Sequence, residues 1–142
     1  MEKEIGTMNR TMDFFMAMEP PTVTAQEHKV VVKNGKPVFY DPPQVKAAKM
    51  KLMAHLGKHI PQKTFDGPIR LTAKWCFPQS SAHPGNTWRT TKPDTDNLQK
   101  LLKDCMTRCG FWHDDAQVVS EITEKFWAKR PGIYLRIEEL ED

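Results

Sequence analysis

The chain is 142 residues long, with 39% hydrophobic and 27% charged residues. This composition fits one folded domain and excludes a disordered chain. The net charge of +3 is too small to indicate a nucleic-acid partner by itself, and no apolar run approaches the length of a membrane span.

The compartment follows from the N-terminus and the cysteines. The first residues are charged and no signal-like apolar segment follows, so we expect a cytoplasmic protein. Cys76, Cys105 and Cys109 are an odd number of thiols, which argues against a disulfide framework and for a reducing compartment. We interpret Cys105 and Cys109 as buried small side chains rather than as zinc ligands.

The N-terminal third of the chain predicts a strand and a hairpin. Residues 1 to 11 are polar and are expected to be loose, whereas Met12 to Met18 is apolar and predicts a strand that ends before Pro20. Residues 29 to 40 predict a hairpin. Its turn is Asn34-Gly35, because both residues tolerate a positive φ.

A helix and a long strand follow. Asp41 and two prolines start a helix that runs to about Gly57, with apolar residues at helical spacing. Its other face carries lysines, which we interpret as a solvated face rather than as a phosphate-binding one. Residues 68 to 78 alternate between apolar and polar side chains, which predicts a half-buried strand.

The C-terminal half predicts a loop, a helix and two strands. Residues 79 to 93 are rich in Ser, Pro and Gly and predict a long loop. A helix begins at Asp96 or Asn97, ends at Cys109 and is closed by Gly110. Residues 118 to 127 and 133 to 140 predict strands. The whole is an α+β domain, with two helices packed on a mixed or antiparallel sheet.

Two acidic clusters flank the second helix. Asp94 and Asp96 lie at its start, and Asp114 and Asp115 lie just beyond its end. Close carboxylates suit a hard divalent cation, although an N-cap and a solvated turn are the more common explanations of such patterns. The two clusters can share a metal only if an adjacent strand brings the second pair back to the helix start, and we expect such a strand.

Lys100 lies one turn beyond the first acidic cluster. Its ammonium could stabilise charge on a phosphate, or it could form an ordinary surface pair with Asp104. We interpret Phe111-Trp112 as core packing rather than as a base-stacking platform, and His113 as an exposed loop residue rather than as a ligand or general base. Composition and spacing alone therefore indicate no more than a possible metal-dependent hydrolase.

The stretch from Lys92 to Val119 carries a more specific pattern. It reads Lys-Pro-Asp-Thr-Asp-Asn-Leu-Gln-Lys, a later Asp104, and then Gly-Phe-Trp-His-Asp-Asp-Ala-Gln-Val-Val. This string closely resembles the RusA family of Holliday junction resolvases, which are small endodeoxyribonucleases of phages and prophages. The match runs from about Lys92 to Lys125 and is looser upstream, where the long loop and the extended N-terminus depart from compact members of the family.

The resemblance implies that residues 1 to 142 form one RusA-like α+β domain with a mixed sheet. It implies a homodimer that nicks opposing strands of four-way junction DNA with Mg²⁺, for which Mn²⁺ can substitute, in the cytoplasm of a bacterial host during recombination or repair. The implied catalytic residues are Asp94, Asp96, Asp115 and Lys100. The implied metal ligands are Asp94, Asp96 and Asp115, together with Asp114 at the neighbouring acidic position.

Basic residues around this stretch are candidates for DNA-backbone contacts, namely Lys74, Arg89, Lys92, Lys100 and Lys125. We expect the dimer contacts at residues 12 to 18 and 79 to 93. Two alternatives stay open: a less selective nuclease for branched DNA, and a non-catalytic protein that binds or regulates junctions. In a purely structural reading the acidic clusters are only caps and turns.

Overall fold

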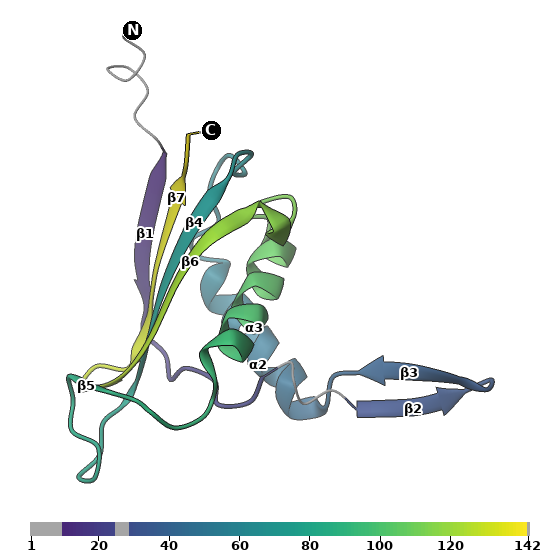
Figure 1. Cartoon of the computed structure of the whole chain (residues 1–142), viewed down its shortest axis with the longest axis horizontal. Helices are drawn as coiled ribbons and strands as arrows, with labels where there is room; N and C mark the ends of the chain where they lie inside the picture. The colour runs from purple at the N-terminus through teal and green to yellow at the C-terminus, as the bar shows by residue number, and fades with distance from the viewer. Residues whose placement is uncertain (1–9, 25–28, 142) are drawn as a thin grey trace, which may run out of the picture.

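The computed structural model describes residues 10–24 and 29–141. Two sheets and two longer helices make up this part of the chain (Figure 1). In chain order the elements are β1 (Thr11–Met16), β2 (Lys29–Lys33), β3 (Lys36–Tyr40), α2 (Pro43–Leu56), β4 (Ile69–Pro78), β5 (Thr87–Trp88), α3 (Thr95–Cys109), η2 (Asp115–Gln117), β6 (Val118–Ala128) and β7 (Gly132–Glu139). The predicted α+β class with a mixed sheet is therefore confirmed.

The main sheet has five strands in the order β1-β7-β4-β6-β5. Its centre mixes orientations, because β4 pairs with β6 in parallel and with β7 in antiparallel. Parallel neighbours need a crossover connection, and here α3 supplies it between β4 and β6. This crossover places the start of α3 near the carboxyl end of β4 and the end of α3 near the start of β6.

One face of this sheet is covered by α2 and α3 (Figure 1). The side chains of β4 that face the helices are fully buried, whereas those on the opposite face alternate with them and are more exposed. Leu98, Leu101, Leu102 and Cys105 of α3 pack into the same core. Phe111 and Trp112 are also buried there, which confirms that they are packing residues.

The turn chemistry predicted from the sequence is present. Asn34 and Gly35 adopt φ angles of 51° and 75°, as the hairpin requires. Gly110 ends α3 in the left-handed conformation, with a φ of 86°. These positions were identifiable because glycine and asparagine tolerate a positive φ.

Some elements differ from the sequence-based expectations. Residue 11 was expected to be loose and the strand to reach Met18, but β1 is Thr11–Met16; residues 1 to 9 lie outside the described part. Asp94, not Asp96 or Asn97, is the residue at the N-cap of α3. The loop at residues 79 to 93 contains the two-residue strand β5, which pairs with the end of β6.

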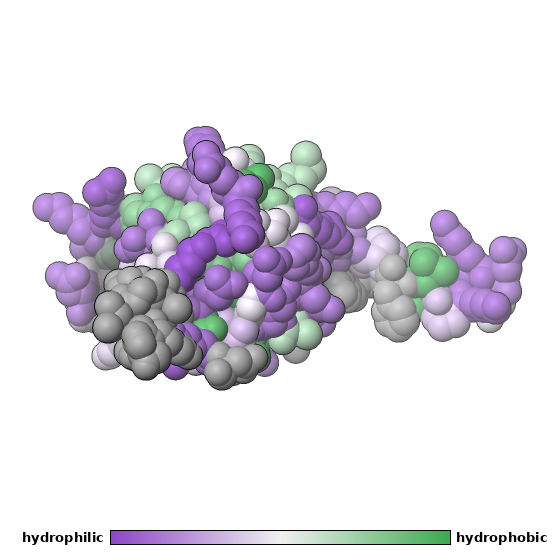
Figure 2. Space-filling view, turned by 90° about the horizontal axis from the view of Figure 1, so that it is seen from above, coloured by the Kyte–Doolittle hydropathy of each residue, from purple (hydrophilic) through white to green (hydrophobic). Residues whose placement is uncertain are grey.

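The β2–β3 hairpin projects away from the main sheet (Figure 1). It forms a sheet of its own, and its valines are exposed, including Val30 at 51% and Val32 at 73%. Figure 2 shows the same projection, with hydrophobic surface near its base and hydrophilic residues at its end. A two-stranded hairpin with an exposed apolar face is only marginally stable alone.

Candidate active site

The loop before α3 is held against the end of β6. The backbone N–H groups of Asn86 and Arg89 donate to Trp127 and Lys125, and Trp88 stacks on Phe126 with ring centroids 4.6 Å apart. The Arg89 guanidinium lies over the rings of Phe77 and Trp127, at 4.2 and 4.5 Å from their centroids. These contacts anchor the segment that leads into the first acidic cluster.

Lys125 fixes the last residues of this loop. Its Nζ donates to the carbonyl oxygens of Thr91 and Pro93, at 2.8 and 2.7 Å. Burial lowers the pKa of Lys125, and the nearby positive charge of Arg89 adds to this effect while Asp94 opposes it. Lys125 therefore acts here as a structural donor beside Asp94 rather than as a free surface cation.

Asp94 and Asp96 occupy the exposed start of α3. Asp94 is the N-cap residue, but its side chain makes no capping hydrogen bond. Its carboxylate is instead 3.6 Å from the ammonium of Lys92, and its side chain is 52% exposed. A carboxylate left out of the cap stays available to a ligand, and Lys100 follows Asp96 one helical turn later on the same exposed side.

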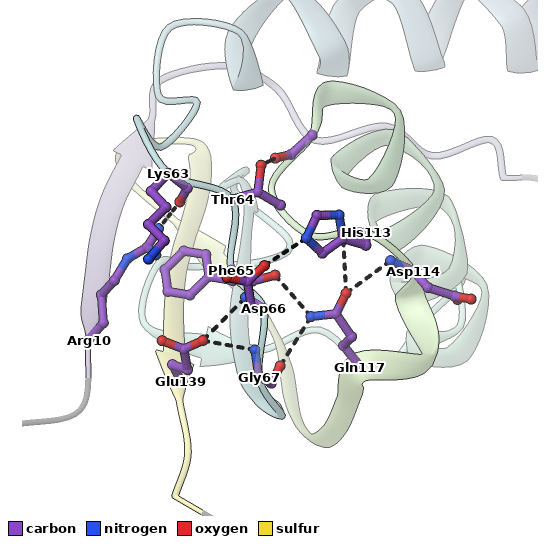
Figure 3. Close-up of polar contacts among 11 residues, drawn as sticks. Arg10, Lys63, Thr64, Phe65, Asp66, Gly67, His113, Asp114, Gln117 and Glu139 are labelled. Carbon is purple, nitrogen blue, oxygen red and sulfur yellow. Dashed lines mark hydrogen bonds and ion pairs between the residues drawn. The ribbon is translucent and has the colours of Figure 1, made fainter.

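The far end of α3 is organised around Gln117 (Figure 3). Its Oε1 accepts from the backbone N–H groups of His113 and Asp114, at 2.8 and 3.1 Å. Its Nε2 donates to the carbonyl oxygens of Phe65 and Gly67, at 2.9 and 3.1 Å. One amide thereby joins the loop before β4 to the turn that carries the second acidic cluster.

Asp114 and Asp115 have different environments within this turn. Asp114 caps η2, since its Oδ1 accepts from the backbone N–H of Ala116 at 2.9 Å, and with Gln117 it forms a capping box. Asp115 does not serve as the cap, and it lines a cavity of about 300 Å³ with Asp104, Arg108 and Asp114. This arrangement favours Asp115 over Asp114 as a metal ligand, as the sequence pattern also did.

His113 is exposed, as expected, and its Nε2 lies 2.7 Å from a carboxylate oxygen of Asp66 (Figure 3). The hydrogen bond from His113 lowers the pKa of Asp66. This contact adds a second link between the turn and the loop before β4, so His113 has a structural role within one chain.

Asp94 and Asp96 lie at one end of α3 and Asp115 at the other. The 15 residues of α3 correspond to roughly 22 Å at the usual rise of an α-helix. The assumption that a strand brings Asp114-Asp115 back to the helix start is wrong for one chain, because β6 leads away from Asp115 and reaches the helix start only at Lys125. Among residues 10–24 and 29–141, no group of three His, Cys, Asp or Glu side chains could hold a metal ion.

The basic residues proposed for DNA contacts divide between the two faces of the sheet. Lys125 aligns with Trp75 and thus lies on the helix-bearing face, near Lys92 and Asp94. Lys74 lies on the opposite face, with its Nζ 4.0 Å from Glu124 and 5.9 Å from the centre of the Tyr134 ring. Lys74 is therefore separated by the sheet from the other candidates.

Gln117 is the residue that sequence reasoning missed. The pattern Asp114-x-x-Gln117 is that of a capping box and could have marked it. No sequence pattern could have shown that the same amide also reaches Phe65 and Gly67, because those contacts depend on the tertiary fold.

Comparison with known proteins gives one family. The family described as endodeoxyribonuclease RusA matches residues 20–138. A protein of Lactococcus phage r1t named crossover junction endodeoxyribonuclease rusA is 28% identical over 130 residues, covering 90% of this chain and 98% of that protein. The uncharacterised protein YqaN of Bacillus subtilis is 29% identical over 120 residues, covering 77% of this chain and 84% of its own length.

A shorter and stronger similarity links the chain to the crossover junction endodeoxyribonuclease RusA of Escherichia coli strain K12. The two are 65% identical over 26 residues, which is 18% of this chain and 22% of that protein. Within the part of the chain that the structure describes, no helix is both long and apolar enough to cross a membrane. The family match includes both acidic clusters and extends over most of the fold, so the chain belongs to the RusA family of endodeoxyribonucleases.

Proposed function

We propose that the chain is a Mg²⁺-dependent endonuclease that resolves four-way DNA junctions by paired nicks in opposing strands. The observation that carries the proposal is the family match, which includes Asp94, Asp96, Lys100 and Asp115. The phage relative that aligns over 98% of its own length is named a crossover junction endodeoxyribonuclease. A role in recombination or repair, in the cytoplasm of a bacterial host, follows from the same proposal.

The donor chemistry of the site fits Mg²⁺. This ion prefers carboxylate and water oxygens, and the exposed carboxylates of Asp94, Asp96 and Asp115 offer such ligands. Mn²⁺, which takes the same ligand types, can substitute. When bound, such an ion supplies an activated water and neutralises charge on the phosphate.

The protein's own groups position the substrate. In this proposal Lys100, one turn from Asp96, places its ammonium against a phosphate oxygen at the scissile bond. Lys92 and Arg89 make the surface before α3 positive and attract the DNA backbone without reading its sequence. Lys125 adds its charge to this surface while its ammonium holds the loop. Lys74, on the other face of the sheet, is not part of this surface.

The test is cleavage of a labelled synthetic four-way junction by the purified chain. We expect paired, symmetric nicks with Mg²⁺, none with EDTA, and a loss of about a hundredfold or more for Asp96→Asn. A linear duplex with the sequence of one junction arm is the control and should stay intact.

The two alternatives give different results in the same assay. A junction-binding protein without catalysis would shift the junction in a gel with no cutting in Mg²⁺, and would be insensitive to Asp96→Asn apart from altered binding. A less selective nuclease would cut flaps and the linear duplex at rates similar to the junction. Either result would replace the resolvase proposal.

A further inference from the structure

The lysines of the chain are unevenly distributed along the sequence. Residues 29–65 contain eight lysines and one acidic residue, Asp41, whereas the whole chain has a net charge of only +3. Asp41 is itself paired, because its Oδ2 lies 2.8 Å from the Nζ of Lys49. The segment that contains the β2–β3 hairpin and α2 is therefore strongly basic, and the rest of the chain has a net negative charge. A basic segment within a weakly charged chain is typical of a surface that binds a polyanion.

The β2–β3 hairpin is basic at its tip and exposed on both faces. Lys33 pairs with Lys36 next to the turn, so both exposed side chains lie on the same face. The paired Val31 and Val38 lie on that face as well, whereas Val32 lies on the opposite face, and all three valines are exposed. Each strand has five residues, so the hairpin reaches about 17 Å from the start of α2, at the usual rise of a β-strand (Figure 1).

Two cavities connect the base of this hairpin to the second acidic cluster. Arg108 lines the cavity of about 300 Å³ that also contains Asp115. Arg108 also lines a second cavity, of about 370 Å³, together with Lys46 and with Asp41, the residue that follows β3. The side chains of Arg108 and Lys46 are both exposed. Exposed basic side chains therefore follow one another from the neighbourhood of Asp115 to the base of the hairpin.

The shape of the hairpin suits duplex DNA. The major groove is about 12 Å wide and admits a two-stranded β-ribbon. Lysines on such a ribbon contact phosphates, and its apolar side chains can pack against thymine methyl groups. The exposed valines alone would also suit a second copy of the chain. The lysines at the tip, and the basic side chains that lead back towards Asp115, favour DNA as the occupant.

We propose that the β2–β3 hairpin, with Lys46 and Arg108 at its base, binds a duplex arm of the junction at a distance from the bond that is cut. The hairpin lies in a groove of that arm, and its two lysines at the tip contact phosphates. The inference rests on the proposed function, because it concerns the DNA that the site would cut. The DNA contacts expected from the sequence lie around the start of α3 or on the opposite face of the sheet, so this surface is an additional one.

The first test measures junction binding without cleavage. A labelled four-way junction is titrated with the protein in EDTA at several salt concentrations, and binding is followed by fluorescence anisotropy. Lys33→Gln/Lys36→Gln should weaken binding. It should also make the slope of log binding constant against log salt shallower by roughly 2 for each copy bound, since each lost phosphate contact removes about 0.9.

A matched control removes the same charge from another part of the basic segment. Lys51 and Lys58 are exposed, and Lys51 lies on a different side of α2 from Lys46, in a cavity with Glu19. Lys51→Gln/Lys58→Gln should leave the salt slope unchanged. An equal change of slope in both double variants would show a general effect of net charge and would overturn the inference.

Ethylation interference locates the contacts on the DNA. In the wild type, phosphates whose ethylation blocks binding should form two groups on a contacted arm. One group lies at the branch point, and the other lies about five base pairs further out, which matches the length of the hairpin. The outer group should disappear in Lys33→Gln/Lys36→Gln while the inner group remains. An unchanged pattern in this variant would overturn the inference.

Cleavage separates the hairpin from the active site. With protein in saturating excess and Mg²⁺ present, Lys33→Gln/Lys36→Gln should cut at the wild-type rate, and only the protein concentration for half-maximal cleavage should rise. If the wild type shows the outer contacts but cuts nothing, the nuclease proposal fails and the hairpin inference stands. If the wild type cuts and the double variant binds as tightly as the wild type, the hairpin inference fails and the nuclease proposal stands.

Sedimentation of the free protein tests whether a second copy occupies the hairpin instead. Val30→Ser/Val32→Ser changes two exposed side chains on one face. This variant should bind the junction more weakly and should sediment like the wild type. A shift to a smaller species would show that this face packs against another copy, and would overturn DNA as its occupant.

Discussion

The two ends of α3 carry carboxylates in contrasting settings. At its start, the exposed carboxylate of Asp94 makes no capping hydrogen bond and lies near the ammonium of Lys92, and the exposed Asp96 accepts from the backbone N–H of Asn97. At its end, a single amide and a capping box fix the turn of Asp115 to the loop before β4. The start of α3 is therefore an exposed, positively charged surface that a phosphate can reach. The turn at the other end instead holds Asp115 in a fixed position.

The largest expected effect comes from neutralising Asp115 and Asp114, the adjacent acids at the end of α3, one at a time. Asp115→Asn should lower junction cleavage by about a thousandfold, because it removes a proposed metal ligand without altering the cap. Asp114→Asn keeps the shape of the cap and should retain most of the cleavage, with a stability loss of about 1 kcal/mol or less. Cleavage rates and thermal unfolding of both variants measure this difference.

Equal loss of cleavage in the two variants would show that Asp114 is a ligand as well. Full cleavage by Asp115→Asn would remove the rigid end from the active site altogether.

The next largest effect is expected at Gln117, which holds the turn that carries Asp115. Gln117→Leu leaves two N–H and two carbonyl groups without the partners that Gln117 supplies, so we expect a loss of about 2–4 kcal/mol in the free energy of unfolding. Cleavage should fall as well, because the position of Asp115 depends on this turn. Urea unfolding measures the first effect. Gln62→Leu, at an exposed position, is the control and should change neither quantity.

At the open end, Lys125→Met tests the anchoring of the loop. It removes two hydrogen bonds to Thr91 and Pro93, which should cost about 1–2 kcal/mol. Since burial lowers the pKa of Lys125, the unfolded chain binds more protons than the folded chain between the folded and the unfolded pKa values. The stability advantage of the wild type over the variant should therefore grow as the pH rises through this interval, which unfolding curves at several alkaline pH values will show.

The smallest expected effect is a gain, not a loss, in the free energy of unfolding. Gln99 lies in the first half of α3 and is 4% exposed, and neither its Oε1 nor its Nε2 has a hydrogen-bond partner among the described residues. Gln99→Leu should therefore stabilise the isolated chain by about 1 kcal/mol, in contrast to the same change at Gln117. Destabilisation would mean that the amide is satisfied in solution, and the two variants are compared by thermal unfolding.

The elements of this fold were predictable where a local rule decided them. The hairpin turn at Asn34-Gly35 and the end of α3 at Gly110 follow from residues that tolerate a positive φ. The strand at residues 69–78 follows from its alternation of apolar and polar side chains. In each case a few neighbouring residues contain the whole signal.

The site was predictable in composition but not in arrangement. The motif identified Asp94, Asp96, Lys100 and Asp115, yet the strand order that sets their distances depends on pairing between segments far apart in the chain. The strand β5 escaped prediction because two residues carry no periodicity, and its pairing is imposed by β6. The N-cap of α3 was misplaced because three residues near its start can each occupy that position.

The length of α3 has a consequence for how one copy meets a DNA backbone. Its two acidic clusters lie roughly 22 Å apart, by the rise of its 15 residues. Phosphates of one strand follow one another at about 3.4 Å along a duplex. A duplex lying along α3 would therefore pass about six phosphates between the clusters, and the two clusters of one copy would face different phosphates.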